Sequence, residues 1–561
     1  MVGTGGDGRS VPRLREGAVV GLALLLWAGL SVGCRGDDTT SVYTESAADE
    51  VEDSAAETPS EAGAEAASEA SEEGPGEDEV SEESEESSEP KFDLADVDLP
   101  PEPPPMIPTT CAEAAAGETS VGCEFFTVDL DSNLDITPFA AVVSNVQDGG
   151  EALVHLDRRV DGAWEPVVEP ALVAPLSVHE FQVEDFHLEG PGINPGGAYR
   201  ITSDLPIIAY QFNPIDGASS YLSDASLLYP VPSWDHRNQV VNYADLSDHA
   251  NPFLTIAAGV DQTVVTVTPS VSTLGGPGLE ATAAGEPVLV ELQAGDTLTF
   301  NPEDPHANLS GTLVESDPER PVAVFSGHGC ANIPKDPCCC DHLEEQLAGV
   351  RLWGKKFIAP HMPIRDGYVP EATLWQIYAS EDGTVVELDY SPMVTGLPAG
   401  PLELDAGEVA DFYVNAPFGV EADFRVEASA PIALVSYMLS AQVLSQPFQN
   451  QGDPAMVHIP PIEQYLPRYV ALVPGTWDAD VLVLMRKAGS TITLDDFPVA
   501  EETFTPLGDA TWEVGRYQIW DGVHTIESGG EPFGVLVVGW DNYDSYAYVG
   551  GAGTVKINPQ G

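Results

Sequence analysis

The sequence contains very few basic residues. In 561 residues it has 21 Lys and Arg against 91 Asp and Glu, which gives a formal net charge of −70. Proteins bind nucleic acid largely by neutralising phosphates with Lys and Arg, so this balance excludes a nucleic-acid partner. A field of this sign is compatible with cationic partners or with solubility alone.

The part of the chain after Cys111 also lacks the short motifs of common catalytic sites. It contains no G-x-S-x-G, no H-E-x-x-H and no G-x-x-x-x-G-K-[ST], and its His residues are scattered. Triad residues need not be close in sequence, so an enzyme is not excluded by this absence. We expect no enzymatic activity and no cofactor, and we keep a secreted hydrolase of extracellular polymers as an alternative.

Long apolar runs are missing as well, apart from one near the start. Basic residues between positions 9 and 15 precede an apolar run from Gly17 to Leu30, which is too short to span a bilayer. The run ends in Leu30-Ser31-Val32-Gly33-Cys34, which resembles a bacterial lipobox, although Ser31 stands where Leu is usual. We therefore expect residues 1–33 to be a lipoprotein signal peptide and Cys34 to be acylated. The chain would be an exported bacterial lipoprotein of the outer membrane or cell surface; ordinary secretion with a later cleavage is the alternative.

Residues 34–110 are predicted to be a disordered tether. Residues 35–100 hold 24 Asp and Glu against two basic residues, Arg35 and Lys91, and almost no aromatics. Such a segment cannot bury enough apolar surface to offset its ordering entropy. It should be extended by self-repulsion and stiffened by the Pro-rich stretch at 100–105.

From residue 111 to 561 the pattern predicts an all-β domain. Short runs of Val, Thr, Ile, Tyr and Phe alternate with polar residues, and Gly, Pro, Asn and Asp punctuate them. Only Asp341 to Leu347 could form a turn or two of helix.

The domain repeats one stretch four times. Its clearest copy, Ala198 to Tyr210, predicts a strand, a Ser-Asp-x-Pro turn and a second, more deeply buried strand. Similar stretches surround Pro321, Pro431 and Pro532, at spacings of 115, 110 and 101 residues from Pro206 onward. Two further short sequence patterns recur in the same order between these stretches, which indicates true internal repetition.

These spacings divide the domain into four antiparallel repeats of about 100–115 residues, approximately 124–251, 252–371, 372–477 and 478–561. Each repeat has room for seven or eight strands. Either a closed propeller-like ring, with two four-stranded blades per repeat, or a row of tandem β-sandwiches would accommodate them. Strands such as Tyr469–Leu472 precede the repeats and could be shared between neighbours, which favours the ring.

Six cysteines remain when Cys34 is set aside, and an even count in an exported chain predicts disulfides. Cys111 and Cys123 would close a short loop at the start of the domain. Cys330 should pair within the cluster at 338–340, and we favour Cys340. Cys338 and Cys339 would then form a strained vicinal pair or remain free thiols.

Two stretches resemble metal sites without matching one. His328 and His342 flank the cysteine cluster, but the ligand spacing fits no zinc finger, so we expect these His to be structural. A loop with alternating side-chain oxygens is a weak calcium candidate, yet it lacks the Gly and Glu of an EF-hand. Its candidate ligands are Asp129, Asp131, Asn133 and Asp135. We expect no metal, and a polar loop between strands there.

Several phrases resemble the IgG Fc-binding protein N-terminal domain family. They are Tyr199–Pro206 with Tyr210–Pro214, Ser223–Leu228, Ser326–Cys330, Cys340–Leu347 and Trp353–Phe357. The resemblance covers most of residues 111–561. In the family the Cys before the Asp-His-Leu phrase is single, and the triple Cys338-Cys339-Cys340 departs from that pattern. The resemblance implies binding rather than catalysis, without implying that this chain binds antibody.

The sequence therefore predicts a lipid-anchored surface protein whose β-repeat head recognises an extracellular protein or glycan through its loops. Contact with the membrane would be through the N-terminal lipid only. The hydrolase named above and a structural envelope protein that assembles with itself are the alternatives.

Overall fold

The computed structural model describes residues 107–115, 118–133, 139–183, 186–214, 222–246, 249–335 and 339–561. The predicted signal peptide, Cys34, the acidic tether up to residue 106, Asp135 and Cys338 lie outside these described residues. The described part is nearly all β, as the sequence predicts, and its one α-helix is the short α1 (Cys111–Ala115). No helix in this part is long and apolar enough to span a membrane.

Residues Leu99–Gly561 form one compact unit, within which strand pairing defines four modules. Module 1 contains β1 (Gly122–Val128), β2 (Phe139–Asn145), β3 (Ala152–Val160), β4 (Ala163–Pro166), β5 (Ala171–Val173), β6 (Ser177–Val183), β8 (Ala198–Asn213) and β9 (Asp224–Leu227). Module 2 contains β7 (Gly192–Asn194), β10 (Arg237–Gln239), β11 (Pro252–Ala258), β12 (Thr263–Thr268), β13 (Val288–Leu292), β14 (Thr297–Phe300), β15 (Leu313–Glu315), β16 (Val322–Ala331) and β17 (Asp341–Gln346).

Module 3 contains β18 (Gly354–Ala359), β19 (Thr373–Ala379), β20 (Thr384–Tyr390), β21 (Leu402–Leu404), β22 (Val409–Val414), β23 (Phe424–Tyr437) and β24 (Met456–Ile459). Module 4 contains β25 (Arg468–Val473), β26 (Ala479–Lys487), β27 (Thr493–Leu494), β28 (Phe497–Pro498), β29 (Phe504–Leu507), β30 (Trp512–Gln518), β31 (Gly522–Glu527), β32 (Gly534–Asp541) and β33 (Asp544–Val549). The short 3₁₀ helices are η1 (Val231–Ser233), η2 (Val350–Leu352), η3 (Ala441–Val443), η4 (Ile462–Gln464) and η5 (Glu501–Thr503).

The pattern of side-chain burial along a strand depends on how close the strand lies to the centre of the protein. In β12, Val265 and Val267 are buried while Val264 before them is exposed and Thr266 between them is half-buried, as the period-two pattern predicts. Strands close to the centre instead bury every residue, as β11 and β19 do. Such strands carry near-continuous apolar runs because both of their faces are covered.

Long strands that bend around a corner connect the two halves of a module. The first half of β8 pairs with β1 and β3, and its second half pairs with β2 and β9. In the same way β23 pairs first with β18 and β20 and then with β19 and β24. In modules 2 and 4 two consecutive strands take the place of the single bent strand. These are β15 and β16 in module 2, and β31 and β32 in module 4.

The predicted Ser-Asp-x-Pro turn is therefore wrong for the first copy, because β8 runs without interruption through Pro206. The Asp204 carboxylate accepts a hydrogen bond from the Leu153 N–H of the neighbouring strand β3 (2.7 Å), rather than closing a reversal. Proline lacks an N–H, and a corner between two sheets is a place where that missing donor is tolerated.

The strand pairing also differs from the predicted repeat boundaries. Modules 2, 3 and 4 each begin with a strand that the prediction assigned to the repeat before it. Strands β10, β18 and β25 pair with β15, β23 and β31, just as β1 pairs with β8. Each of these strands precedes the corresponding predicted boundary at 252, 372 or 478. We therefore propose a division before β10, β18 and β25, so that these strands belong to the module that follows them.

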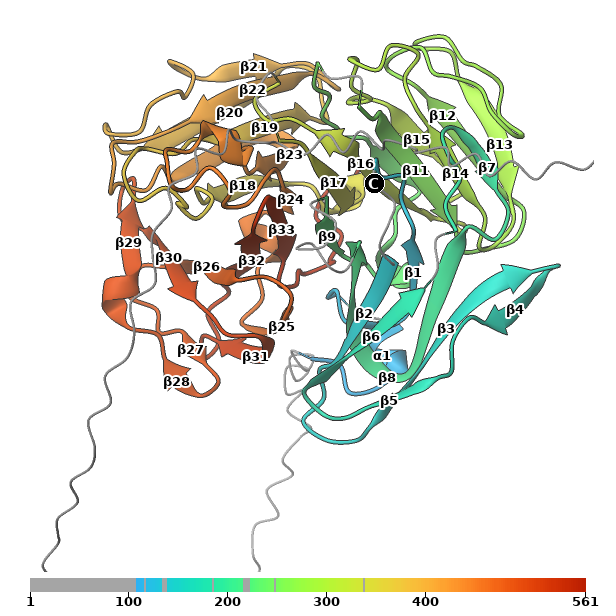
Figure 1. Ribbon diagram of the computed structural model, residues 1–561, viewed down its shortest axis with the longest axis horizontal. Helices are drawn as coiled ribbons and strands as arrows, with labels where there is room; N and C mark the ends of the chain where they lie inside the picture. Colours follow the sequence, from blue (N-terminus) through green and yellow to red (C-terminus); the bar gives the residue numbers. More distant parts are fainter. Residues whose placement is uncertain are drawn as a thin grey trace, which may run out of the picture. The chain divides into compact units, whose positions relative to one another are not determined.

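The last strand of each module lies at the centre, and together these strands close a ring (Figure 1). Strand β9 contacts β17 and β33, and β24 contacts the same two, so that modules 1 to 4 follow one another in a cycle. We call β9, β17, β24 and β33 the hub. Every residue of the four hub strands is buried. The helical turn considered for Asp341 to Leu347 is wrong, since this segment contains β17.

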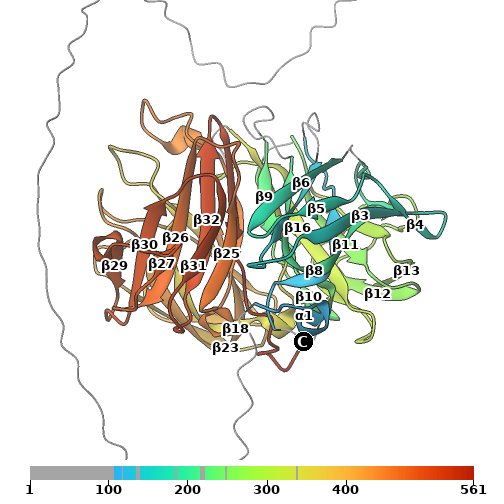
Figure 2. The same cartoon turned by 90° about the horizontal axis from the view of Figure 1, so that it is seen from below.

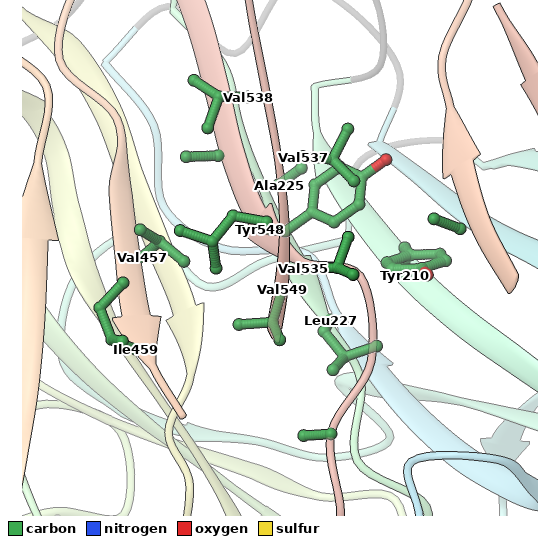
Figure 3. Packing of buried hydrophobic residues seen from close by; sticks show 14 of the residues in the cluster. Tyr210, Ala225, Leu227, Val457, Ile459, Val535, Val537, Val538, Tyr548 and Val549 are labelled. Atoms are coloured by element: carbon green, nitrogen blue, oxygen red, sulfur yellow. The ribbon is translucent and has the colours of Figure 1, made fainter. Parts of the chain in front are cut away.

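Apolar side chains from several modules pack beside the hub strands (Figure 3). Tyr210 of β8 and Tyr548 of β33 have ring centroids 4.8 Å apart, next to Leu227 of β9. Val457 of β24 lies in the same cluster. The core thus extends across module boundaries, which explains why the modules form one compact unit.

The sheets are curled and unequal, with four to eight strands each, and are not uniform four-stranded blades. Module 4 shows the arrangement most clearly: one sheet has the order β25-β31-β27-β28 and the other β29-β30-β26-β32-β33. In Figure 2 the strands of both sheets run in nearly the same direction. The described part therefore joins features of both expected architectures, a closed ring and modules with two sheet layers.

Candidate functional site

The loop that is the weak calcium candidate lies at the junction of modules 1 and 2, and its first carboxylate oxygens have protein partners there. The Asp129 carboxylate accepts a hydrogen bond from the Phe186 N–H (2.7 Å) and lies 3.9 Å from Nδ1 of His187. An Asp131 oxygen lies 4.0 Å from Nε2 of the same His. The Asn133 N–H donates to the Gly329 carbonyl (3.1 Å). Within the described residues, no group of three or more His, Cys, Asp or Glu is arranged to hold a metal ion.

The two His that flank the cysteine cluster are buried inside the same junction. Nδ1 of His328 accepts a hydrogen bond from the Cys330 N–H (3.1 Å), so the proton of the neutral ring is on Nε2, which lies 3.7 Å from an Asp245 oxygen. His342 stacks on Phe253, with ring centroids 5.8 Å apart. Burial lowers the pKa of His328 to about 4 and that of His342 to about 3. Both imidazoles are therefore neutral at physiological pH.

Two disulfides join pairs of described cysteines, Cys111 with Cys123 and Cys330 with Cys340, which are the pairs that the sequence analysis favours. Cys111 of α1 is bonded to Cys123 of β1, with Cα atoms 5.6 Å apart. Cys330 of β16 is bonded to Cys340, with Cα atoms 5.0 Å apart. The second bond spans the connection into β17 and so fixes the entry to a hub strand. No cysteine among the described residues is a free thiol, and these include Cys339.

The hub contains a set of buried carboxyl groups that sequence reasoning did not identify. Each module places one Asp at the start of its hub strand or shortly before it. These residues are Asp224, Asp341, Asp453 and Asp544. Glu344 and Glu345 of β17 add two more carboxyls, and each of the six residues is 0–3% exposed.

Asp224 connects all four hub strands. One of its oxygens accepts hydrogen bonds from the N–H groups of Ala225 (2.9 Å) and Ala547 (3.3 Å). The other accepts from the N–H groups of Met456 (3.0 Å) and Glu344 (3.3 Å). A single carboxylate therefore satisfies backbone donors of β9, β17, β24 and β33, which ties the four modules together at one point.

The other three Asp residues make fewer bonds. An Asp341 oxygen accepts from the Ser545 N–H (3.3 Å) and an Asp544 oxygen accepts from the Ser223 hydroxyl (2.7 Å), so both link different modules. Oδ1 of Asp453 accepts from the Ala441 N–H (2.8 Å). Oδ2 of Asp453 and Oδ2 of Asp544 are buried without a hydrogen-bond partner among the described residues.

The two Glu residues of β17 extend this network toward neighbouring strands. Glu345 accepts from the Ser226 hydroxyl of β9 (2.9 Å) and from the His458 N–H of β24 (3.0 Å). Glu344 accepts from the side-chain amide of Gln211 in β8 (2.7 Å). Every bond joins β17 to another strand, so these carboxyls position the hub strands against one another.

Burial determines the charge state of these groups. It raises the pKa of Glu345 and of Asp544 to about 8. Burial also raises the pKa of the other four, and for Asp341 the neighbouring hub Asp residues raise it further. Burial lowers the pKa of nearby His458 to about 4, so this imidazole supplies no balancing charge. The hub therefore favours protonated carboxyls at neutral pH.

The arrangement of the hub suits closure of the ring and not reaction with a substrate. Its carboxyls are covered on all sides, and their hydrogen bonds go to backbone and side-chain groups of the neighbouring strands. The sequence contained a signal for parts of the set, since Asp224 and Asp341 stand in the phrases Ser-Asp-Ala-Ser and Asp-His-Leu. Asp453 precedes β24 by three residues, so a search for one fixed spacing misses it.

Comparison with known proteins gave one match. A family model described as IgGFc binding protein matches residues 224–539, more than half of the chain, from the first residue of β9 through most of β32. No curated protein and no solved structure matches the sequence or the fold.

Proposed function

Because the chain belongs to the IgGFc binding protein family, we propose that it is a lipid-anchored surface protein whose four-module head binds an extracellular protein. The family match is the single observation that carries this proposal, since it covers module 3, all of module 2 except β7, and most of module 4. Two disulfides support an oxidising, extracellular location. The continuous buried core supports a rigid head, which is the usual scaffold for recognition by surface loops.

The binding proposal is tested with the full chain immobilised against arrays of extracellular proteins, antibody Fc fragments and glycans. A fragment with residues 34–110 serves as the control, because it carries much of the negative charge but none of the head. We expect protein ligands that bind the full chain and not the fragment. If only glycans bind the full chain, the ligand is a glycan and not a protein. Equal binding by the full chain and the fragment would overturn the proposal.

The anchor is tested separately from the ligand. Metabolic labelling with a fatty-acid analogue should mark the wild-type chain, and Cys34→Ser should abolish the label and release the protein from the membrane fraction. Ala substitution of the neighbouring Ser31 is the matched control and should leave the label in place. A Cys34→Ser variant that stays labelled would overturn the lipid anchor and leave the binding proposal unaffected.

A further inference from the structure

The outer sheet of module 4 exposes two aromatic side chains to solvent. Trp520, in the connection between β30 and β31, is 78% exposed, and Phe497 at the start of β28 is 75% exposed. Large aromatic side chains normally bury most of their surface, so two such residues, one in this sheet and one in the connection that leads into it, need an explanation. Strands β27, β28 and β31 lie together at the lower edge of module 4 (Figure 1).

One imidazole ties the two segments that carry these aromatics. Nδ1 of His524 lies 2.7 Å from a carboxylate oxygen of Asp495, and Nε2 lies 2.7 Å from the Trp520 carbonyl oxygen. Asp495 is also bonded to Thr525, since its carboxylate accepts from the Thr525 N–H and its own N–H donates to the Thr525 carbonyl (2.9 Å each). The Trp520 loop and the β27–β28 hairpin are thus held in a fixed relation to β31.

The hairpin that presents Phe497 adopts an uncommon turn. Leu494 pairs with Phe497 across a two-residue loop, and the loop residues Asp495 and Asp496 have φ of 47° and 68°. A turn with two positive φ values matches the twist of a hairpin but usually contains Asn or Gly. Asp adopts this left-handed region more readily than most residues other than glycine, but it does so at a backbone cost. The bonds of Asp495 to His524 and Thr525 offset that cost, so the turn is rigid without glycine.

The surroundings of the two aromatics are strongly acidic. Between residues 488 and 555 the sequence contains eleven Asp or Glu and one basic residue other than His524, which is Arg516. Arg516 is buried and is engaged with Asp423, with nitrogen and oxygen 2.6 Å apart. The described residues of this segment therefore offer no exposed Lys or Arg to neutralise Asp495, Asp496 and Asp521.

We propose that this face, formed by Trp520, Phe497 and the surrounding Asp residues, binds an Arg- or Lys-rich segment of the protein ligand. This inference rests on the proposed function and names the chemistry of its partner. A guanidinium group stacks on an indole face and pairs with carboxylates at the same time, which matches what the face presents. A second copy of this chain does not fit, because the contact would bring two acidic faces together.

The test uses the full chain and two synthetic ten-residue probes, one of alternating Arg and Gly and one of alternating Glu and Gly, titrated at physiological salt. We expect the Arg probe to bind and to change the Trp fluorescence, and the Glu probe not to bind. Trp520→Ala should weaken binding of the Arg probe three- to thirty-fold, the range measured for cation–π contacts. Phe497→Ala and Asp496→Asn should weaken it by smaller factors.

Tyr368→Ala is the matched control, because Tyr368 is likewise an exposed aromatic, 68% exposed, before β19 in module 3, and its ring centroid lies 5.5 Å from that of Phe448. It should leave the affinity for the Arg probe unchanged. Equal weakening by Tyr368→Ala and Trp520→Ala, or no weakening by Trp520→Ala, would overturn the assignment of this face. If Trp520→Ala still retains the protein ligands found on the arrays at full affinity, only this inference fails; if the wild-type chain retains none, the proposed function fails.

Discussion

The hub and the outer face of module 4 use the same residue types in opposite ways. At the hub, carboxyl groups are buried, and Asp224 accepts four backbone N–H groups. On the outer face, carboxyls surround aromatic side chains that remain in solvent. The polar groups of the hub are therefore hydrogen-bonded within the protein, while the aromatic side chains of the outer face are exposed to solvent. The comparison indicates that the centre maintains the ring, and it agrees with the proposal that the outer face contacts a partner.

The largest effect is expected from Asp224→Ala, which removes the carboxylate shared by the four hub strands. It leaves four buried N–H groups without an acceptor, and each orphaned group costs about 1–3 kcal/mol, so we expect a loss of about 4 kcal/mol or more. Calorimetric unfolding at pH 4 checks this, because Asp224 is then about half protonated in the unfolded chain as well, so proton uptake on folding contributes little to the difference. Glu403→Ala, at an exposed position of β21, is the control and should change stability by less than about 0.5 kcal/mol.

The pH dependence of folding separates hub carboxyls from surface ones. The folded-state pKa of each hub carboxyl lies above its value in the unfolded chain, so the unfolded chain loses these protons first as pH rises. Stability should therefore fall between pH 6.5 and about 8, the folded pKa of Glu345 and Asp544. The lowered His pKa values reduce stability only below about pH 6.5. We expect Tm to fall on the order of 5 °C over that interval.

Asp544→Asn should remove part of this dependence. Oδ1 keeps its bonds to Ser223, and the amide nitrogen replaces the oxygen that has no partner. The variant should therefore gain more in Tm at pH 8 than at pH 5.5, because the cost of proton uptake on folding grows from the unfolded pKa of about 4 up to the folded pKa of about 8. Asp453→Asn should behave alike, since its Oδ2 is also without a partner. An equal gain at both pH values would show that charge is not the cause.

The two disulfides give a smaller and more specific comparison. Their sequence separations are 10 and 12, so the loop-closure contribution should be similar, about 2–3 kcal/mol each. Cys330 is buried in β16, whereas Cys111 and Cys123 are partly exposed. Replacing Cys330 and Cys340 by Ser should cost about 1 kcal/mol more than the same change at Cys111 and Cys123, because a Ser hydroxyl is then buried. Equal Tm losses would contradict this.

The smallest effect on folding is expected at the outer face. Trp520→Ala removes a side chain that is largely in solvent, so the free energy of unfolding should change by less than about 0.5 kcal/mol. Trp375→Ala is the contrasting variant, because Trp375 is fully buried in β19, and it should cost about 3–5 kcal/mol. A large loss of stability for Trp520→Ala would remove the distinction between hub and outer face.

The sequence by itself determined the β character of residues 111–561 and the fourfold recurrence of one stretch, because period-two patterns and repeated phrases are local signals. The even number of cysteines in an exported chain predicted disulfides, but the sequence alone left the partner of Cys330 within residues 338–340 open, and the structure bonds it to Cys340. Local signals were misleading where burial decides the outcome. The polar run Asp341 to Gln346 is a buried hub strand, and Pro206 lies inside a bent strand instead of a turn.

Only the tertiary structure brought Asp224, Asp341, Asp453 and Asp544 to one centre, because their meeting depends on ring closure and not on any spacing along the chain. It alone also decided that Trp520 and Phe497, in two segments held to His524 of β31, stay exposed while most other described Trp and Phe residues are buried. Sequence patterns report which residues prefer to be covered, and long-range packing determines which of them are covered.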